Sequence, residues 1–232
     1  MDAELLFQPF SSRGSSSTLG SVLLDELRSG LYENLFVAVA FATSSGTSRL
    51  CAGVQEFVQA GGFARFVCGI GNGVTSRQAV AHLLRAGAVV TGVALSGGNL
   101  FHQKVYRLVG ERRGLLVVGS NNLTLDGLFR HFEASTLLRL DPLLAQELAI
   151  LDEPLQLIEQ LQRDHAANFL DLTRDSLDGL SQEGLLIDER TRPPRATSEV
   201  DESDESEQDQ QATPNRTRSV PPITVPAPPA AA

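Results

Sequence analysis

The residues best suited to chemistry lie in two short pieces of the sequence, His102-Gln103-Lys104 and Gly119-Ser120-Asn121-Asn122. The first piece lies in a predicted strand over 100–109, where side chains two residues apart point to the same face. His102 and Lys104 are therefore expected about 6–7 Å apart along the backbone. This spacing allows an imidazole to approach a phosphorus atom while an ammonium binds one of its non-bridging oxygens.

The second piece directly follows an apolar strand predicted over 114–118. Gly119 at the strand end allows the backbone to turn and to approach an anion closely. Ser120 and Asn122 supply hydrogen-bond donors, and a helix starting after Asn122 would add free N–H groups. Each piece alone is common, but the two together on neighbouring strands predict one phosphate-binding site.

Lys104 is the only lysine of the chain, and the other 18 basic residues are arginines. A compact ammonium and a planar guanidinium are not interchangeable in a tight site. The one lysine in a chain that otherwise uses arginine supports a role for Lys104 in binding phosphate.

With their flanks, FHQKVYRL and GLLVVGSNNLTLDGLFRHFEAS, the two pieces resemble the HxK…GSxN signature of the phospholipase D superfamily, most closely its nuclease branch. The resemblance covers about residues 35–140. It implies a metal-independent phosphodiesterase without a cofactor, in which one histidine attacks phosphorus and a second protonates the leaving group. Carried over, the catalytic residues are His102, Lys104, Asn122 and Glu133, and Gly119, Ser120 and Thr124 bind substrate.

The chain departs from this signature at two positions. Val109 replaces an aspartate that often stands five residues after the motif lysine. Glu133 takes the place of a downstream acid of the nuclease branch. It either orients His102 and favours its imidazolium form or is a solvated carboxylate at a strand start. His131 replaces a frequent asparagine, and it is either a second acid–base group or an unrelated surface residue.

The single motif supplies one histidine, whereas the chemistry implied by the resemblance uses two. Superfamily members with one motif are homodimers, so the resemblance implies a homodimer with one active site on its two-fold axis.

DNA or RNA is the first substrate hypothesis, although the net charge of −9 argues against a non-specific polyanion binder. Five arginines near the motif in sequence are expected to make the local field positive. They are residues 107, 112, 113, 130 and 139. Two alternatives remain: a lipid or small-molecule phosphodiesterase, disfavoured because no membrane-binding amphipathic helix is evident, and a non-catalytic nucleic-acid-binding module.

The elements that must position these residues alternate between strands and helices. This pattern predicts an α/β fold with a mixed central β-sheet flanked by helices. Strands are expected at 5–7, 34–42, 63–70, 88–95, 100–109, 114–118 and 134–140, and helices at 17–28, 47–60 and 75–86. The segment 142–180 reads as helical, with a break at Pro154.

The composition changes near residue 188, which predicts a catalytic domain over 1–187 and a disordered tail over 188–232. The tail holds eight of the 11 prolines and carries a net charge of −4. Such a segment buries too little apolar surface to fold. It is either a solubilising tail or an acidic segment that mimics nucleic acid or recruits a partner protein.

Further observations bear on the compartment. No apolar run is long enough to span a bilayer, and no signal peptide is visible. The two cysteines, Cys51 and Cys68, are too few for a disulfide scaffold and are expected in the core. We therefore expect a cytoplasmic protein that does not associate with a membrane.

Overall fold

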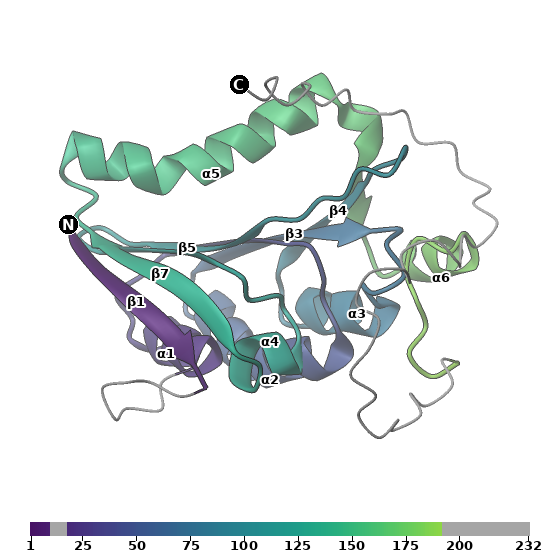
Figure 1. Cartoon of the computed structure of the whole chain (residues 1–232), viewed down its shortest axis with the longest axis horizontal. Helices are drawn as coiled ribbons and strands as arrows, with labels where there is room; N and C mark the ends of the chain where they lie inside the picture. The colour runs from purple at the N-terminus through teal and green to yellow at the C-terminus, as the bar shows by residue number, and fades with distance from the viewer. Residues whose placement is uncertain (10–17, 192–232) are drawn as a thin grey trace, which may run out of the picture.

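The computed structural model describes residues 1–9 and 18–191 (Figure 1). At its centre is an eight-stranded sheet in the order β1-β7-β6-β5-β2-β3-β4-β8. Strands β2, β3 and β4 are mutually parallel, and the other neighbouring pairs are antiparallel. The predicted α/β fold with a mixed central sheet is confirmed. Most of the predicted tail, residues 192–232, lies outside the described residues.

The strands are β1 (Asp2–Gln8), β2 (Asn34–Val39), β3 (Phe63–Ile70), β4 (Val89–Ala94), β5 (Lys104–Val109), β6 (Gly114–Gly119), β7 (Glu133–Leu140) and β8 (Phe169–Leu172). The helices are α1 (Leu19–Arg28), α2 (Ser44–Gln59), α3 (Arg77–Arg85), α4 (Leu125–Phe129), α5 (Ala145–Asp164) and α6 (Leu177–Gln182), with a short 3₁₀ turn at Ala166–Asn168. None of these helices is long and apolar enough to cross a membrane.

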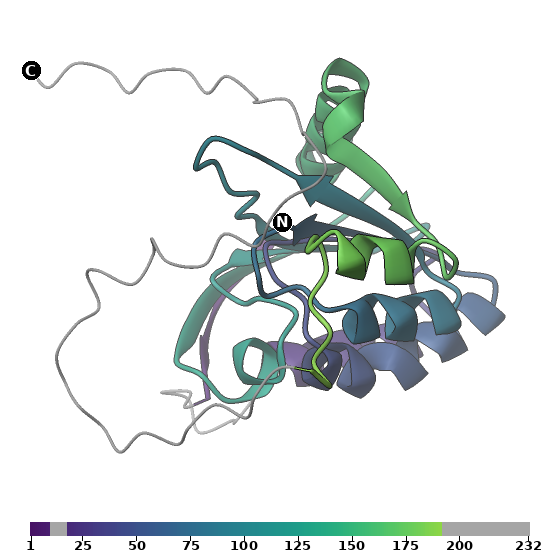
Figure 2. The ribbon, with the colours of Figure 1, turned by 90° about the vertical axis from the view of Figure 1, so that its right-hand side faces the viewer.

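Helices cover both faces of the sheet. Helices α1–α4 and α6 lie on one face, and α5 crosses the other (Figures 1 and 2). On β2, Leu35 and Val37 pack into the core beneath the first layer, whereas Phe36 and Ala38 pack into the core on the side of α5. Burial on both faces explains why β2 reads as a continuous apolar run and not as an alternating one. Cys51 and Cys68 pack with the core under the first layer, as expected.

The segment 142–180 differs from the prediction. Helix α5 continues through Pro154, since Leu151 and Ile158 lie seven residues apart on one stripe and are both fully buried. Their packing outweighs the hydrogen bond that proline removes. Strand β8 then pairs antiparallel with β4. A strand of only four residues carries too little alternation to be recognised in the sequence.

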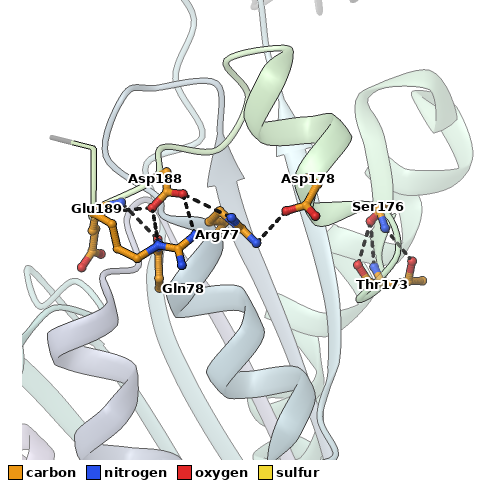
Figure 3. Close-up of polar contacts among 8 residues, drawn as sticks. Arg77, Gln78, Thr173, Ser176, Asp178, Asp188 and Glu189 are labelled. Atoms are coloured by element: carbon orange, nitrogen blue, oxygen red, sulfur yellow. Dashed lines mark hydrogen bonds and ion pairs between the residues drawn. The ribbon is translucent and has the colours of Figure 1, made fainter.

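Asp188 and Glu189, which the composition assigned to the tail, contact the N-terminal ends of α3 and α2. Figure 3 shows the contacts with Arg77 and Gln78 of α3. Asp188 accepts hydrogen bonds from Arg77 Nη1 at 3.2 Å and from Gln78 Nε2. Glu189 Oε1 accepts from Ser44 N, at the start of α2, at 2.8 Å. We call residues 185–191 the C-terminal strap, because they tie two helices to the end of the described chain.

Candidate active site

Three segments meet at one end of the sheet, where β2 ends, β5 begins and β6 ends. Strand β5 lies between the other two, and the loop after β6 passes its start to reach the end of β2. Leu123 N donates to Phe41 O at 3.0 Å, and Thr43 N donates to Leu123 O at 3.1 Å. Asn122 Oδ1 accepts from Phe41 N at 3.2 Å. This crossing places the second sequence piece beside the first.

His102 and Lys104 are in direct contact. Lys104 Nζ lies 2.8 Å from His102 Nε2, 2.9 Å from Nδ1 and 3.2 Å from the His102 carbonyl oxygen. The predicted proximity is therefore confirmed, but its predicted cause is wrong in part. Strand β5 starts at Lys104, and His102 lies in the irregular segment before it. A bond from Ala40 N to Gln103 O, 2.8 Å long, holds this segment against the end of β2.

Phe41 is a site residue that the sequence analysis missed. Its ring stands edge-on to the His102 imidazole, with centroids 5.9 Å apart and an interplanar angle of 76°. Lys104 Nζ lies 5.9 Å from the same ring centroid, within reach of a cation–π contact. Phe41 thus packs against both polar groups. In the sequence it is one more apolar residue of the run over 34–42, and nothing in its type indicates this position.

The electrostatics favour a neutral imidazole beside a charged amine. The pKa of His102 lies below its ordinary value of 6.5, first because the ring is partly removed from water and second because of the Lys104 charge. Burial also lowers the pKa of Lys104, and the nearby Glu133 carboxylate opposes that effect. Lys104 is only 8% exposed, whereas His102 is exposed to solvent. An accessible neutral imidazole is the form that can act as a nucleophile.

The hydrogen-bond partner of Glu133 is Ser120 and not His102. Its carboxylate accepts a hydrogen bond from the Ser120 hydroxyl, and the pKa of His102 is lowered and not raised. Ser120 is further tied to β7, because its N–H donates to Ala134 O at 3.1 Å and its Oγ accepts from Ala134 N at 3.2 Å. Glu133 therefore fixes Ser120 and supports the charge of Lys104, and a role in favouring the imidazolium has no support here.

Gly119 and Thr124, which we predicted to bind substrate, each have a structural role in the fold. A Cβ on Gly119 would lie 1.9 Å from Ser135 Oγ on β7, so only glycine fits there. Thr124 is the N-cap of α4, and its Oγ1 accepts from Gly127 N at 2.9 Å. Both residues shape the loop that carries Asn122. Their contact with substrate remains a prediction.

Asn121 is a second residue that the sequence analysis did not use. It is 1% exposed; its Nδ2 donates to Gly127 O at 2.7 Å, and its Oδ1 accepts from Ser135 Oγ. Its backbone oxygen accepts from the Tyr106 hydroxyl at 3.0 Å. The two adjacent asparagines therefore have different roles. Asn121 holds the loop from inside, and Asn122 faces the end of β2.

Four of the five arginines lie away from the motif, which corrects the expectation from sequence. Arg107 is buried on the α5 side, where Nε donates to Leu151 O at 2.7 Å and the guanidinium pairs with Asp152. Arg112 and Arg113 lie in the turn between β5 and β6, about 20 Å from Gly119 along the strand. Arg139 lies toward that same far end and forms an ion pair with Glu26. These arginines are close to the motif in sequence but far from it in space, because a six-residue strand runs from one end of the sheet to the other.

The end of α4 holds the remaining polar groups near the site. Arg130 Nη1 lies 3.6 Å from Asp126 Oδ1, and His131 Nε2 lies 3.9 Å from Asp126 Oδ2. The His131 side chain is 67% exposed. Both interpretations of His131 stay open, and the basic side chain in contact with His102 is Lys104.

Comparison with known proteins identifies the fold. No family model and no curated protein matches the chain. Among solved structures, NucT from Helicobacter pylori superposes with a TM-score of 0.51 at 12% identity, over 74% of this chain and 99% of NucT. A phospholipase D family member, Nuc from Salmonella typhimurium, superposes with a TM-score of 0.49 at 17% identity, over 74% of this chain and 97% of Nuc.

Phosphatidylserine synthase from Haemophilus influenzae gives a TM-score of 0.48 at 17% identity, over 73% of this chain and 40% of the synthase. The architecture is an α/β sandwich around one mixed sheet. More narrowly, the chain shares the fold of NucT. At 12% identity, the similarity to NucT establishes a shared fold and no more.

Proposed function

We propose that this protein is a metal-independent phosphodiesterase that hydrolyses DNA or RNA through a phosphohistidine on His102. The observation that carries the proposal is the contact between an exposed imidazole and the buried ammonium of Lys104, at 2.8–2.9 Å. The HxK…GSxN pattern and the fold support the same class of chemistry. The lowered pKa of His102 favours its nucleophilic form near neutral pH.

In the first step, a ring nitrogen of His102 attacks phosphorus. A nitrogen–phosphorus bond forms, and the bond from phosphorus to the leaving oxygen breaks. The Lys104 ammonium and the Nδ2 group of Asn122 bind the non-bridging oxygens as negative charge grows on them. Asn122 Oδ1 is engaged by Phe41 N, so its amino group is the half of the amide that can donate.

The leaving oxygen needs a proton that a neutral His102 cannot supply. In the proposal, the His102 of a second copy of the chain, in its protonated form, gives that proton. In the second step, water attacks the phosphohistidine and gives a proton to the same second histidine. The nitrogen–phosphorus bond breaks, and the first His102 returns to its neutral form.

A cleavage assay in EDTA tests the proposal. The substrates are single- and double-stranded DNA, single- and double-stranded RNA, and bis(p-nitrophenyl) phosphate as a minimal phosphodiester. We expect EDTA-resistant cleavage of nucleic acid by the full chain. The His102→Ala variant should lose at least about a thousandfold in rate, since the nucleophile is removed.

His165→Ala is the matched control, because His165 follows α5, far from the site in the chain, and should keep its activity. Cleavage that EDTA abolishes, or that His102→Ala retains, would contradict the mechanism. Cleavage of the minimal diester alone would leave a phosphodiesterase and remove the nuclease assignment. Nucleic-acid binding without any cleavage would favour a non-catalytic module.

A further inference from the structure

Phe41 contacts three of the groups that act in the proposed mechanism. Its ring stands edge-on to the His102 imidazole, with 5.9 Å between the centroids, and its centroid lies 5.9 Å from Lys104 Nζ. Its backbone N–H donates to Asn122 Oδ1 at 3.2 Å. The nucleophile, the cation and the amide therefore meet at one half-buried residue that has no acid, base or nucleophile of its own.

The backbone around Phe41 is held independently of its side chain. Its carbonyl oxygen accepts a hydrogen bond from Leu123 N at 3.0 Å. The neighbours Ala40 and Ala42 are fully buried, and their backbone groups bond to the segment before β5 and to the N-cap of α3. The ring thus projects from an anchored segment, and a change of side chain leaves the backbone contact with Asn122 in place.

Among the residues that the structure describes, the His102 ring is held without a carboxylate, the group that often orients an active-site histidine. Its two nitrogens contact Lys104 Nζ instead, at 2.9 and 2.8 Å. That contact ends when the ammonium binds a phosphate oxygen, as the proposed mechanism requires. The edge-on contact with Phe41 uses no hydrogen bond, so it remains while Lys104 holds substrate.

An aromatic ring suits both neighbours of Phe41. The face of such a ring is negative and its edge is positive, so edge-on packing with a second ring and a cation near the centroid are both favourable. The ring also covers part of the imidazole with apolar surface. This cover agrees with burial as the first cause of the lowered pKa of His102.

We propose that Phe41 is a positioning residue, whose ring holds the His102 imidazole in the orientation for attack on phosphorus and whose backbone N–H turns Asn122 Nδ2 toward the phosphate. The proposal rests on the proposed function and adds a residue to its site. Attack requires the reacting nitrogen to point at phosphorus. The ring keeps that orientation after Lys104 has turned to the substrate.

Steady-state cleavage of bis(p-nitrophenyl) phosphate by the full chain tests the role of the ring. Phe41→Leu keeps an apolar side chain and removes the ring. We expect its kcat to fall at least about tenfold, because the imidazole samples unproductive orientations. Its KM should change less than about threefold, since Lys104 and Asn122 still bind the phosphate. Phe41→Tyr keeps the ring and should keep kcat within about threefold of wild type.

Phe36→Leu is the matched control. Phe36 lies on β2, about 16 Å from Phe41 along the strand. Arg65 Cζ lies 6.0 Å from its ring centroid, so this variant also removes a phenyl ring beside a cation. Because Phe36 is buried in the core on the α5 side, the variant should lower the Tm and leave kcat unchanged. Equal losses of kcat in Phe36→Leu and Phe41→Leu, or a Phe41→Leu variant with unchanged kcat, would overturn the positioning role.

A measurement without substrate tests the contact itself. Phe41→Ala removes the apolar cover from the imidazole and leaves the charge of Lys104 in place. The pKa of His102 should then rise toward 6.5, and Phe41→Tyr should keep it at the wild-type value. NMR titration of the His102 ring signals measures these pKa values, and circular dichroism checks that both variants fold. An unchanged pKa in Phe41→Ala would contradict the contact.

Failure of this proposal can be told apart from failure of the proposed function. A wild-type chain that cleaves phosphodiesters in EDTA, with full kcat in Phe41→Leu, would leave the activity standing and remove the role of Phe41. A wild-type chain that cleaves no phosphodiester would remove the proposed function, and the role of Phe41 in the attack with it.

Discussion

At the residue scale, the side chain of Lys104 has a large effect on the candidate site. It contacts both ring nitrogens of His102, is almost fully buried, and packs near the Phe41 ring. A flexible amine of this size can turn from the imidazole to a phosphate oxygen without moving the backbone. An arginine needs more room and a planar set of acceptors, which explains why a chain rich in arginine has a lysine at this position.

Lys104→Arg tests this steric argument. We expect the variant to lose at least about a hundredfold in kcat/KM, because the guanidinium would displace the phosphate from the His102 nitrogen. Steady-state cleavage of a short oligonucleotide measures the effect. Turnover close to wild type would show that the pocket has space for a larger cation.

The protonation of His102 gives a second test at this scale. A lowered pKa means that the imidazole loses its proton at a more acidic pH than the ordinary 6.5, so it is neutral from below that value upward. Replacing Lys104 with methionine removes one of the two causes, and the pKa should rise toward 6.5. NMR titration of the histidine ring signals measures the pKa of His102 in the wild-type chain and in Lys104→Met. A wild-type pKa above 6.5, or no rise in Lys104→Met, would contradict the electrostatic account.

Sequence reasoning found part of the site at this scale and missed part. His102, Lys104 and Asn122 were predictable because their types and spacing suit phosphate chemistry. Phe41 and Asn121 were not, because their roles depend on the loop after β6 crossing to the end of β2. The types of the residues in a loop do not indicate which strand end the loop contacts in the folded protein.

At the scale of elements, the sheet order explains why the site forms where it does. Strand β5 is paired on both sides, so the ends of β2 and β6 flank its start. The strands were predictable from apolar runs bounded by turns. The course of α5 through Pro154 and the short strand β8 were not, since packing against the sheet decides both.

The C-terminal strap is the element that leads to a stability prediction. Hydrogen bonds from Arg190, Gln78 and Arg77 hold the pKa of Asp188 well below its ordinary value of 3.8. A carboxyl with a lowered folded-state pKa stabilises the fold above about pH 4, and this stabilisation is lost as the pH falls below that value. Asp188→Asn should lower the Tm at pH 7 and flatten the fall in Tm between pH 4 and pH 3.

Thermal unfolding followed by circular dichroism measures both effects, with Asp178→Asn as the control. Asp178 pairs with the same Arg77 at 2.6 Å, but its side chain is 72% exposed, so its removal should change the Tm little. Equal effects of the two variants would show that the strap does not depend on Asp188.

At the scale of the whole molecule, the distribution of charge differs from what the sequence predicted. The chain is acidic, and the arginines expected near the motif are buried, paired or at the far end of the sheet. The proposed site therefore has fewer positive charges around it than the sequence suggested. Sequence spacing alone could not reveal this, because it does not say which end of a strand a residue occupies.

Replacing Arg112 and Arg113 with serine tests that distribution. These residues lie about 20 Å from Gly119, beyond the screening length of roughly 8–10 Å at physiological salt. We expect kcat/KM to stay within about twofold of wild type at 0.15 M salt. A loss of more than tenfold would place part of the substrate on the turn between β5 and β6.

In the proposed mechanism, His102 becomes covalently bonded to phosphorus. Rapid acid-free quenching of the wild-type chain during turnover, followed by peptide mass spectrometry under alkaline conditions, tests it most directly. We expect a nucleotidyl adduct on the peptide that contains His102, absent from His102→Ala. Turnover with no adduct on any histidine, or an adduct on another residue, would contradict it.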